Sequence, residues 1–433
     1  MLKKVIIFAV LSATLFSSFS FFALAYELDK SKGTVDGYYL FDLKHNLIMA
    51  EENTDKLISP SSTAKIMTAC IVLESGIDLN TEVTVSDKMI TNVSGRNMLL
   101  KAGDHLTIED LLYAMLCGGY NDATHVLALT VSPALYKFAE LMNAKANELN
   151  MENTRYLNPT GLSSNGMFTT INDIAKLVKY MSENETFVKI CSTKQYRLSS
   201  KSSCEFKNIT NRSALISEYY GLSNFNTGSG DDGDCAVLYY TTDNVSIISI
   251  VMNARSNNPE NNDNLAEMYS KKLISHATND YSTQTLKTSK SVITSLPVKY
   301  SISSESINVY LKDDLKVFLK NDIGIAESLT YSIYINEGEL KAPLNIGDIV
   351  GTLSVFDDKG TLITSVPLTV NENIERNTFL YLMDIIRQFV LSKVFLFILI
   401  LFSLLLIVFY FSRKKKFRKS KKKNKRKRRR SRV

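Results

Sequence analysis

A serine and a lysine three residues apart are the first pair in this sequence whose side chains could do chemistry. Ser62 and Lys65 lie within residues 58–69, where Pro60 ends an extended stretch and an apolar run begins at Ile66. This pattern predicts a helix start, with both side chains on one face of the first turn. A serine is a weak nucleophile at its ordinary pKa, and a buried lysine whose pKa is lowered can serve as its base. A capped helix with a solvated lysine is the alternative interpretation.

Cysteine and histidine, the usual ligands of transition metals, do not cluster in the sequence. The five cysteines are an odd number without a Cys-x-x-Cys pair, and the four histidines are scattered. Neither pattern is typical of a metal site. Cys70 and Cys117 fall in apolar helical stretches, which predicts buried thiols. We therefore expect chemistry by side chains alone, with no metal and no cofactor.

The two ends of the chain predict secretion and a membrane anchor. Residues 1–25 begin with a basic segment, continue with an apolar run and end in an Ala-Leu-Ala sequence, which is typical of a signal peptide cleaved after Ala25. An uncleaved anchor is the alternative. Residues 394–411 contain no charged residue over 18 positions. At the rise of an α-helix, this length is just enough to cross a hydrocarbon core of about 30 Å.

Positive charge is concentrated in the tail. The whole chain carries a net charge of +7, and residues 413–433 hold 16 Lys or Arg and no acid, so the remainder carries −9. Positive charge next to a membrane helix stays on the cytoplasmic side, where it can lie against anionic lipid headgroups. We therefore predict a single-pass protein of the cell membrane with an extracytoplasmic body, a transmembrane helix at 394–411 and a cytoplasmic tail at 412–433. The acidic body argues against a nucleic-acid partner.

The segments that must position Ser62 are mixed in type. Residues 37–50 are typical of a hairpin, 81–85, 235–240 and 245–251 of strands, and helical patterns follow residues 62, 106, 142 and 170. Glycines interrupt the helical pattern at 111–131, which places Asn121 in a loop between two helical halves. A largely helical centre between strand pairs predicts a sheet packed against helices, an α/β (α+β) domain at 26–283.

Composition changes near residue 283. Residues 284–372 contain short alternating strands broken by Gly and Asp turns, which predicts a small all-β sandwich. Residues 373–393 carry Ile386, Phe389 and Val390 at helical spacing, which indicates an amphipathic linker at the membrane interface.

Several segments, taken in order, resemble the low-molecular-mass penicillin-binding proteins, the serine-type D-alanyl-D-alanine carboxypeptidases. They are residues 58–69, 111–122, 149–151 with 158–162, Thr227-Gly228 before Asp231-Asp232, and 342–351, the last similar to the family's C-terminal β-domain. The resemblance covers roughly residues 30 to 372. It implies a penicillin-binding, β-lactamase-like transpeptidase fold for the first domain, followed by the β-domain.

The first two motifs of the family assign three catalytic residues. Ser62 resembles the nucleophile that forms the acyl-enzyme, and Lys65 resembles its general base. The family's second motif is Ser-x-Asn, whose serine relays a proton and whose asparagine binds the peptide amide. Here it reads Gly119-Tyr120-Asn121, so the asparagine is present and the serine is not.

The third motif, Lys-Thr-Gly on an edge strand, is also changed. Here it reads Asn226-Thr227-Gly228, which keeps the backbone pairing to substrate and loses the cation for the terminal carboxylate. Arg255 resembles an arginine on the following strand that could hold that carboxylate bidentately. A surface arginine at a strand end is the alternative.

Two functions from different classes follow. The first is a membrane-tethered carboxypeptidase, in which Ser62 attacks the penultimate carbonyl of peptidoglycan stem peptides ending in D-Ala-D-Ala and water hydrolyses the acyl-enzyme. β-Lactams would be its covalent inhibitors. The second is a catalytically impaired relative that binds peptidoglycan or β-lactams, or that scaffolds cell-wall enzymes.

The departures at Gly119 and Asn226 favour the second function, whereas the intact pair of Ser62 and Lys65 favours the first. Loss of a positioned proton-transfer partner costs roughly 10²–10⁴-fold, and loss of a charge-assisted hydrogen bond about 1.5–3 kcal/mol. Restoring serine at 119 and lysine at 226 is therefore expected to raise hydrolysis. A β-lactamase is a third possibility, because Glu148-Leu149-Asn150 resembles the Glu-x-Glu-Leu-Asn segment of class A enzymes. The position of the deacylating glutamate, however, is Ala146.

Overall fold

The computed structural model describes residues 26–199, 202–258, 264–303, 305–321, 328–336, 339–357 and 360–430. The signal peptide predicted at residues 1–25 lies outside them. The chain divides into two compact units, Met1–Tyr281 and Ser282–Val433. Each unit is described by itself below.

An antiparallel sheet forms the centre of the first unit, with strand order β3-β2-β10-β9-β8 and β1 paired to β10. Its strands are β1 (Gly33–Thr34), β2 (Gly37–Asp42), β3 (Leu47–Glu52), β8 (Leu222–Gly230), β9 (Gly233–Thr241) and β10 (Ser246–Ser256). The order leaves β8 at an edge of the sheet. The predicted hairpin at 37–50 corresponds to β2 and β3.

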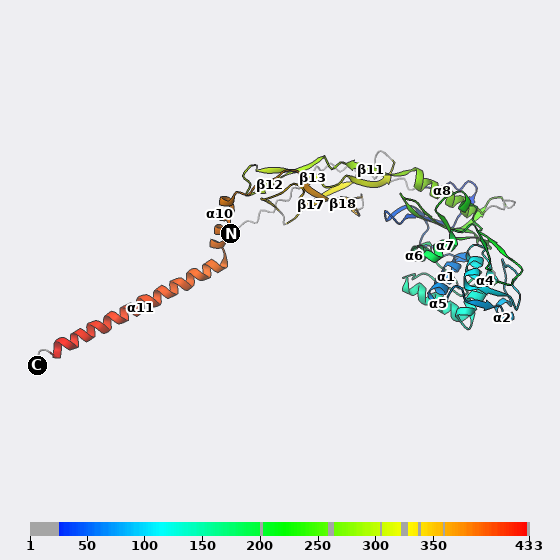
Figure 1. Ribbon diagram of the computed structural model, residues 1–433, viewed down its shortest axis with the longest axis horizontal. Helices are drawn as coiled ribbons and strands as arrows, with labels where there is room; N and C mark the ends of the chain where they lie inside the picture. The colour runs from blue at the N-terminus through cyan, green and yellow to red at the C-terminus, as the bar shows by residue number, and fades with distance from the viewer. Residues whose placement is uncertain are drawn as a thin grey trace. The chain divides into compact units, whose positions relative to one another are not determined.

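Helices pack against this sheet, as predicted. They are α1 (Ala64–Glu74), α2 (Asp87–Ile90), α3 (Ile108–Leu116), α4 (Asn121–Val131), α5 (Leu135–Glu148), α6 (Ile171–Ser182), α7 (Glu185–Cys191) and α8 (Leu265–Asn279). Figure 1 shows α8 apart from the group formed by α1 and α4–α7, and α8 packs on β9 and β10. Two short ribbons complete the unit: β4 (Glu82–Thr84) with β5 (His105–Thr107), and β6 (Gln195–Arg197) with β7 (Asn208–Thr210).

Helix α1 lies in the core of the first unit. Its first seven residues are all buried, so the polar side chains of Lys65 and Thr68 lie in the core among apolar side chains. The Thr68 hydroxyl donates to the Pro159 carbonyl at 2.7 Å, which satisfies it. Cys70 and Cys117 are buried free thiols, as predicted.

The helical pattern at 111–131 forms two helices, α3 and α4, separated by residues 117–120. Gly119 has φ = +72°, a backbone conformation that only glycine adopts without strain, and it turns the chain between the helices. Asn121 is the first residue of α4, so the expectation that it lies in the loop was wrong by one position. In the first turn of α4, the Asp122 carboxylate accepts hydrogen bonds from Met98 N and Leu100 N, both at 3.1 Å, and so joins the helix start to the loop at 98–100.

The second unit is all-β up to its C-terminal helices, which confirms the fold class predicted for it. A six-stranded sheet has the order β15-β17-β18-β13-β12-β16, and β11 pairs with β14. The strands are β11 (Tyr281–Lys287), β12 (Val292–Lys299), β13 (Ser306–Leu311), β14 (Leu315–Lys320), β15 (Thr330–Ile335), β16 (Leu340–Lys341), β17 (Ile349–Phe356) and β18 (Leu362–Val370). Val309, Leu315, Val355 and Leu368 lie at the centre of its core.

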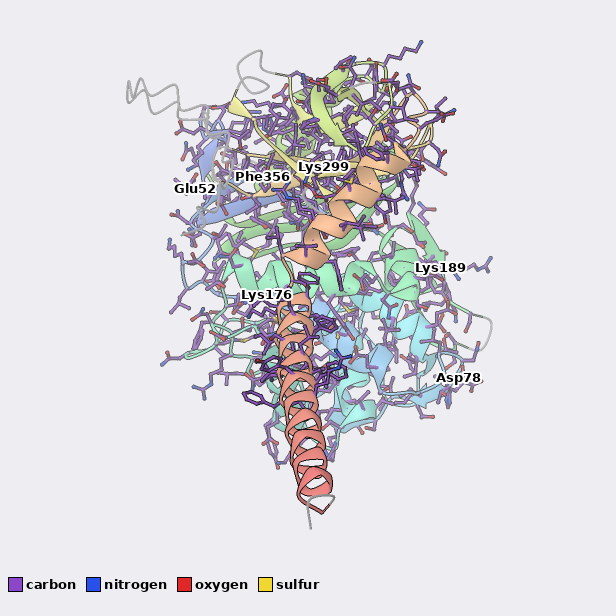
Figure 2. All side chains as sticks on the ribbon, turned by 90° about the vertical axis from the view of Figure 1, so that its left-hand side faces the viewer. Glu52, Asp78, Lys176, Lys189, Lys299 and Phe356 are labelled. Atoms are coloured by element: carbon purple, nitrogen blue, oxygen red, sulfur yellow. The ribbon has the colours of Figure 1, made fainter. Side chains whose placement is uncertain are left out.

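Two helices follow the β-strands, α10 (Thr378–Val390) and α11 (Lys393–Arg430). Among the described residues, one helix is long and apolar enough to cross a membrane, at Lys393–Phe411, with a mean hydropathy of 3.1. None of this stretch is buried in the protein. Figure 2 shows its side chains standing out from the helix.

Candidate active site

Ser62 lies in a single turn of 3-10 helix, η1 (Ser61–Thr63), directly before α1. The turn is tightly constrained, since Ser61 has φ = +45° although it is not glycine. The turn at 158–162 packs on it so closely that a Cβ on Gly161 would lie 1.6 Å from Ser61 O. Strained backbone of this kind persists only where the surroundings fix it, and it is frequent at active sites.

Lys65 is buried one turn further on, with 4% of its surface exposed. Its Nζ donates a hydrogen bond to the Thr160 carbonyl at 2.8 Å. Burial, with a contribution from the positive charge of Arg212, lowers the pKa of Lys65 to about 7. The solvated lysine of the alternative interpretation does not fit this position. A large fraction of the amine is neutral at pH 7 and able to accept a proton.

The edge strand β8 runs beside the nucleophile. A Cβ on Gly228 would lie 2.8 Å from Ser62 Oγ and 3.1 Å from Ser62 Cβ, so glycine leaves the hydroxyl its space. The Thr227 hydroxyl donates to Asn224 Oδ1 at 2.7 Å. Asn226 is 6% exposed, and its Nδ2 is buried without a hydrogen-bond partner.

Asn121 is the second polar side chain of this site with an unsatisfied atom. It is 4% exposed, and its Nδ2 donates to the Ser94 carbonyl at 2.8 Å. Its Oδ1 is buried and accepts no hydrogen bond. Unpaired buried polar atoms are uncommon and costly in folded proteins. A peptide group offers one N–H donor and one carbonyl acceptor. The unpaired Asn121 Oδ1 matches the N–H, and the unpaired Asn226 Nδ2 matches the carbonyl oxygen.

Arg212 is a site residue that the sequence interpretation missed. It follows β7, and its backbone N–H donates to the Cys117 carbonyl at 3.1 Å. A Cβ on Gly119 would lie 3.0 Å from Arg212 Cδ and 3.2 Å from Nη1, and a Cβ on Gly228 would lie 3.6 Å from the same Nη1. The guanidinium therefore lies between the second and third motifs and close to Ser62.

The electrostatic surroundings of Arg212 leave it available to an anion. Burial and the charge of Arg96 lower the pKa of Arg212, while Asp234 and Glu267 act in the opposite direction. Those carboxylates are occupied by other donors, Asp234 by Leu265 N at 2.8 Å and Glu267 by Leu215 N at 3.1 Å. In the part of the chain that the structure describes, the guanidinium of Arg212 makes no hydrogen bond or ion pair.

Arg255 is not brought into this group. It lies on β10, its side chain is 50% exposed, and Nη1 pairs with Asp36 Oδ1 at 3.6 Å. Asp36 precedes β2, which pairs with β10 on the side opposite β9. Lys56 contacts the same carboxylate at 3.0 Å. Arg255 is thus part of a charged cluster on the far side of β10, separated from β8 by strand β9.

Metal ligands do not gather anywhere among these residues. The described ranges contain no group of three or more His, Cys, Asp or Glu side chains that could hold an ion. The site is therefore built from one hydroxyl, one buried amine, two asparagine amides and one guanidinium, a set suited to acyl transfer.

Comparison with known proteins identifies sequence families for most of the chain. The sequence model of the family D-alanyl-D-alanine carboxypeptidase matches residues 29–256, and that of the penicillin-binding protein 5 C-terminal domain matches residues 281–376. The D-alanyl-D-alanine carboxypeptidase DacF of Bacillus subtilis is 25% identical over 348 residues, which cover 77% of this chain and 84% of the relative. DacC of Escherichia coli is 29% identical over 355 residues, covering 79% and 84%.

A solved structure supports the fold. Penicillin binding protein 5 from Haemophilus influenzae superposes with a TM-score of 0.56 at 22% identity, covering 80% of this chain and 98% of that one. Because the two sequences are only 22% identical, this similarity shows a shared fold and nothing further.

Proposed function

Because the chain belongs to the D-alanyl-D-alanine carboxypeptidase family of serine peptidases, we propose that it removes the terminal D-alanine of peptidoglycan stem peptides through an acyl-enzyme on Ser62. The observation that carries the proposal is the burial of Lys65 one turn from Ser62, with a pKa of about 7. A neutral amine at this place is the base that a serine nucleophile needs.

In the first half of the reaction, Ser62 Oγ attacks the carbonyl carbon of the penultimate D-alanine while Lys65 accepts the hydroxyl proton. The negative charge that develops on the carbonyl oxygen lies near the N-terminal end of α1, whose dipole favours it. When the C–N bond breaks, Lys65 returns the proton to the leaving amino group. Water then attacks the ester, Lys65 takes its proton, and Ser62 is released with its hydroxyl restored.

The edge of β8 is the proposed place of the peptide. An extended chain can add to an exposed sheet edge by main-chain hydrogen bonds, and Thr227-Gly228 retain the backbone for that pairing. The unpaired Asn121 Oδ1 can accept from a peptide N–H, and the unpaired Asn226 Nδ2 can donate to a carbonyl oxygen. These contacts would hold the scissile bond against Ser62.

Arg212 is the proposed partner of the terminal carboxylate. The third motif has lost its cation at Asn226, whereas Arg212 Nη1 lies 3.6 Å from a Cβ position on Gly228. A guanidinium can bind a carboxylate bidentately, so it can replace an ammonium in this task. The role predicted for Arg255 would require that side chain to leave Asp36.

Membrane attachment is the remaining part of the proposal. The apolar stretch Lys393–Phe411 supports a single-pass anchor, and the basic residues after it favour a cytoplasmic tail with the catalytic unit outside. In α10, Phe379, Leu382 and Ile386 are exposed, which suits a helix lying in the interface next to the anchor.

A relative that binds peptidoglycan without turning it over is the second candidate, favoured by Gly119 and Asn226. Labelled penicillin followed by intact-mass measurement separates the two at the first step. We expect an adduct on Ser62 that is absent from Ser62→Ala, together with D-alanine release from a D-Ala-D-Ala peptide. No adduct would contradict the acyl-transfer proposal, and an adduct without D-alanine release would favour the second candidate.

A further inference from the structure

Two arginines are fixed on the same turn, the one formed by residues 117–119. Arg96 Nε donates to the Gly118 carbonyl at 2.7 Å. Arg212 donates its backbone N–H to the Cys117 carbonyl at 3.1 Å and lays its side chain against Gly119. The cationic ends of both side chains therefore lie beside the second motif, next to the nucleophile.

Neither cation has an acidic partner within the described ranges. The Arg96 guanidinium lies 5.0 Å from the centroid of the Tyr120 ring, a cation–π contact, and the residue is exposed to solvent. The charge of Arg96 lowers the pKa of Arg212, which indicates that the two like charges act on each other. Two like charges on one turn repel, and a bound anion on either of them lowers that repulsion. The chain outside the basic tail is acidic, so this local excess of positive charge contrasts with its surroundings.

The loop that carries Arg96 is pinned in place. Arg96 O accepts from Asn121 N at 2.7 Å, and Ser94 O accepts from Asn121 Nδ2 at 2.8 Å. The Asp122 carboxylate holds the next part of the loop through two backbone N–H groups. The backbone that carries Arg96 is thus held in place before any ligand arrives. The buried, unpaired Oδ1 of Asn121 at the same place fits an N–H donor, such as the backbone amide of the same peptide.

We propose that Arg96 and Arg212 form a subsite for two carboxylates of one peptide. Arg212 takes the terminal carboxylate, and Arg96 takes a carboxylate on the side chain of the residue that precedes D-Ala-D-Ala. This inference rests on the proposed function and narrows its substrate class. Diaminopimelate is lysine with one additional carboxylate at the end of its side chain. The enzyme therefore prefers stem peptides that carry diaminopimelate, with that carboxylate free, over those that carry lysine.

The test compares two acetylated tripeptides, meso-diaminopimelyl-D-Ala-D-Ala and lysyl-D-Ala-D-Ala, which differ by that one carboxylate. D-Alanine release by the full chain in detergent gives kcat/KM for each. We expect a preference for the diaminopimelyl peptide of about tenfold or more, the scale of one charge-assisted hydrogen bond. The Arg96→Ala variant should bring the ratio close to one through the KM of the diaminopimelyl peptide. Arg96→Lys should keep part of the preference.

The matched control is Lys189→Ala. Lys189 is an exposed cation on α7, and Figure 2 shows it at the outer margin of the protein. Its removal should leave the ratio unchanged. Equal kcat/KM values for the two peptides in the wild-type chain would overturn the proposal, as would a preference that survives in Arg96→Ala.

Binding of both peptides to Ser62→Ala by calorimetry tests the same preference without turnover. Equal affinities there would overturn the two-carboxylate subsite on its own. Absence of a penicillin adduct on Ser62 in the wild-type chain would instead contradict the proposed function, so the two failures are distinguishable.

Discussion

The side chain of Arg212 fills the space in front of Gly119, where an added Cβ would lie 3.0 Å from Arg212 Cδ. The family's second motif places a serine side chain at this position. In this chain the missing hydroxyl and the neighbouring guanidinium are therefore linked, because the glycine makes room for the arginine. Restoring the serine alone no longer restores the family's arrangement.

Gly119→Ser alone is accordingly expected to slow acylation, whereas the sequence predicts that serine at 119 together with lysine at 226 raises hydrolysis. The new side chain requires Arg212 to shift by a few tenths of an ångström, and residue 119 has φ = +72°. A left-handed conformation costs an L-residue about 1–2 kcal/mol. The rate of adduct formation with labelled penicillin and the free energy of unfolding in urea measure the two effects.

Gly76→Ser is the matched control for that variant. Gly76 has φ = +76°, and an added Cβ meets no atom within 4 Å. It should lose a similar amount of stability while acylating at the wild-type rate. Faster acylation by Gly119→Ser than by the wild type would contradict this prediction. It would show that the absence of the serine hydroxyl limits the rate, and that Arg212 does not take over its function.

Gly228→Ala is expected to block the nucleophile. The added Cβ would lie 2.8 Å from Ser62 Oγ, and displacement of a reacting atom by about 1 Å costs on the order of 100-fold in rate. Gly230→Ala on the same strand is the control, because its Cβ would meet Ser61 Oγ at an ordinary 3.7 Å. Penicillin acylation of both variants, with circular dichroism to verify folding, measures the difference. Equal rates would show that β8 does not border the nucleophile in solution.

Arg212→Ala should affect both substrate binding and the base. Loss of a bidentate carboxylate partner is expected to raise the KM of a D-Ala-D-Ala peptide by about 10- to 100-fold. The Arg212 charge lowers the pKa of Lys65, so its removal should raise that pKa and move the pH profile of acylation to higher pH. Arg255→Ala, measured in parallel, distinguishes the two arginines. A larger rise in KM for Arg255→Ala would assign the carboxylate to Arg255, as the sequence suggested.

Lys65 also gives the stability of the protein a pH dependence. Its pKa is about 7 in the folded state and near its ordinary 10.5 in the unfolded state, so between these values the unfolded chain binds more protons. Its contribution to the free energy of unfolding therefore rises as pH increases from 7 to 10.5. Urea titrations of the wild type and Lys65→Met at several pH values isolate this contribution, since other groups are common to both. Parallel pH dependences would show that Lys65 is solvated.

Truncated chains distinguish the contribution of helix α10 to membrane binding from that of the apolar stretch Lys393–Phe411. A chain ending at residue 392 loses the apolar stretch Lys393–Phe411 and keeps α10, whose apolar side chains are exposed. We expect it to bind membranes peripherally and to be released by carbonate, whereas the full chain resists carbonate. A chain ending at residue 377 should be recovered without membranes. Carbonate-resistant binding of the chain ending at 392 would contradict the anchor at Lys393–Phe411.

Local sequence patterns predicted much of the fold and the pairing of Ser62 with Lys65. Ser62 and Lys65 are three residues apart, so helix geometry alone links them, and the apolar run after them correctly indicates a helix in the core. The approach of Gly228 to Ser62 joins positions far apart in the chain. No periodicity reports such a contact, so only the resemblance to a family pointed to it.

Arg212 was missed for a similar reason. It lies outside the strands and helices, between β7 and the short helix η2 (Ala214–Ser217), and no spacing marks it. The one available signal was indirect: a carboxylate-binding site that has lost its lysine at Asn226 needs another cation. Arg255 was proposed because it resembles a family arginine on the strand that follows the third motif. The structure pairs it instead with Asp36 of the β1–β2 connection, and no pattern in the sequence predicts that ion pair.

The rate of penicillin acylation as a function of pH tests most directly whether Lys65 is the base for Ser62. With Lys65 at a pKa of about 7, the second-order rate constant should rise from pH 5.5 to pH 8 with a midpoint near 7 and then level off. A rate that still rises tenfold per pH unit above pH 9, as expected for a lysine at its ordinary pKa, would contradict the account.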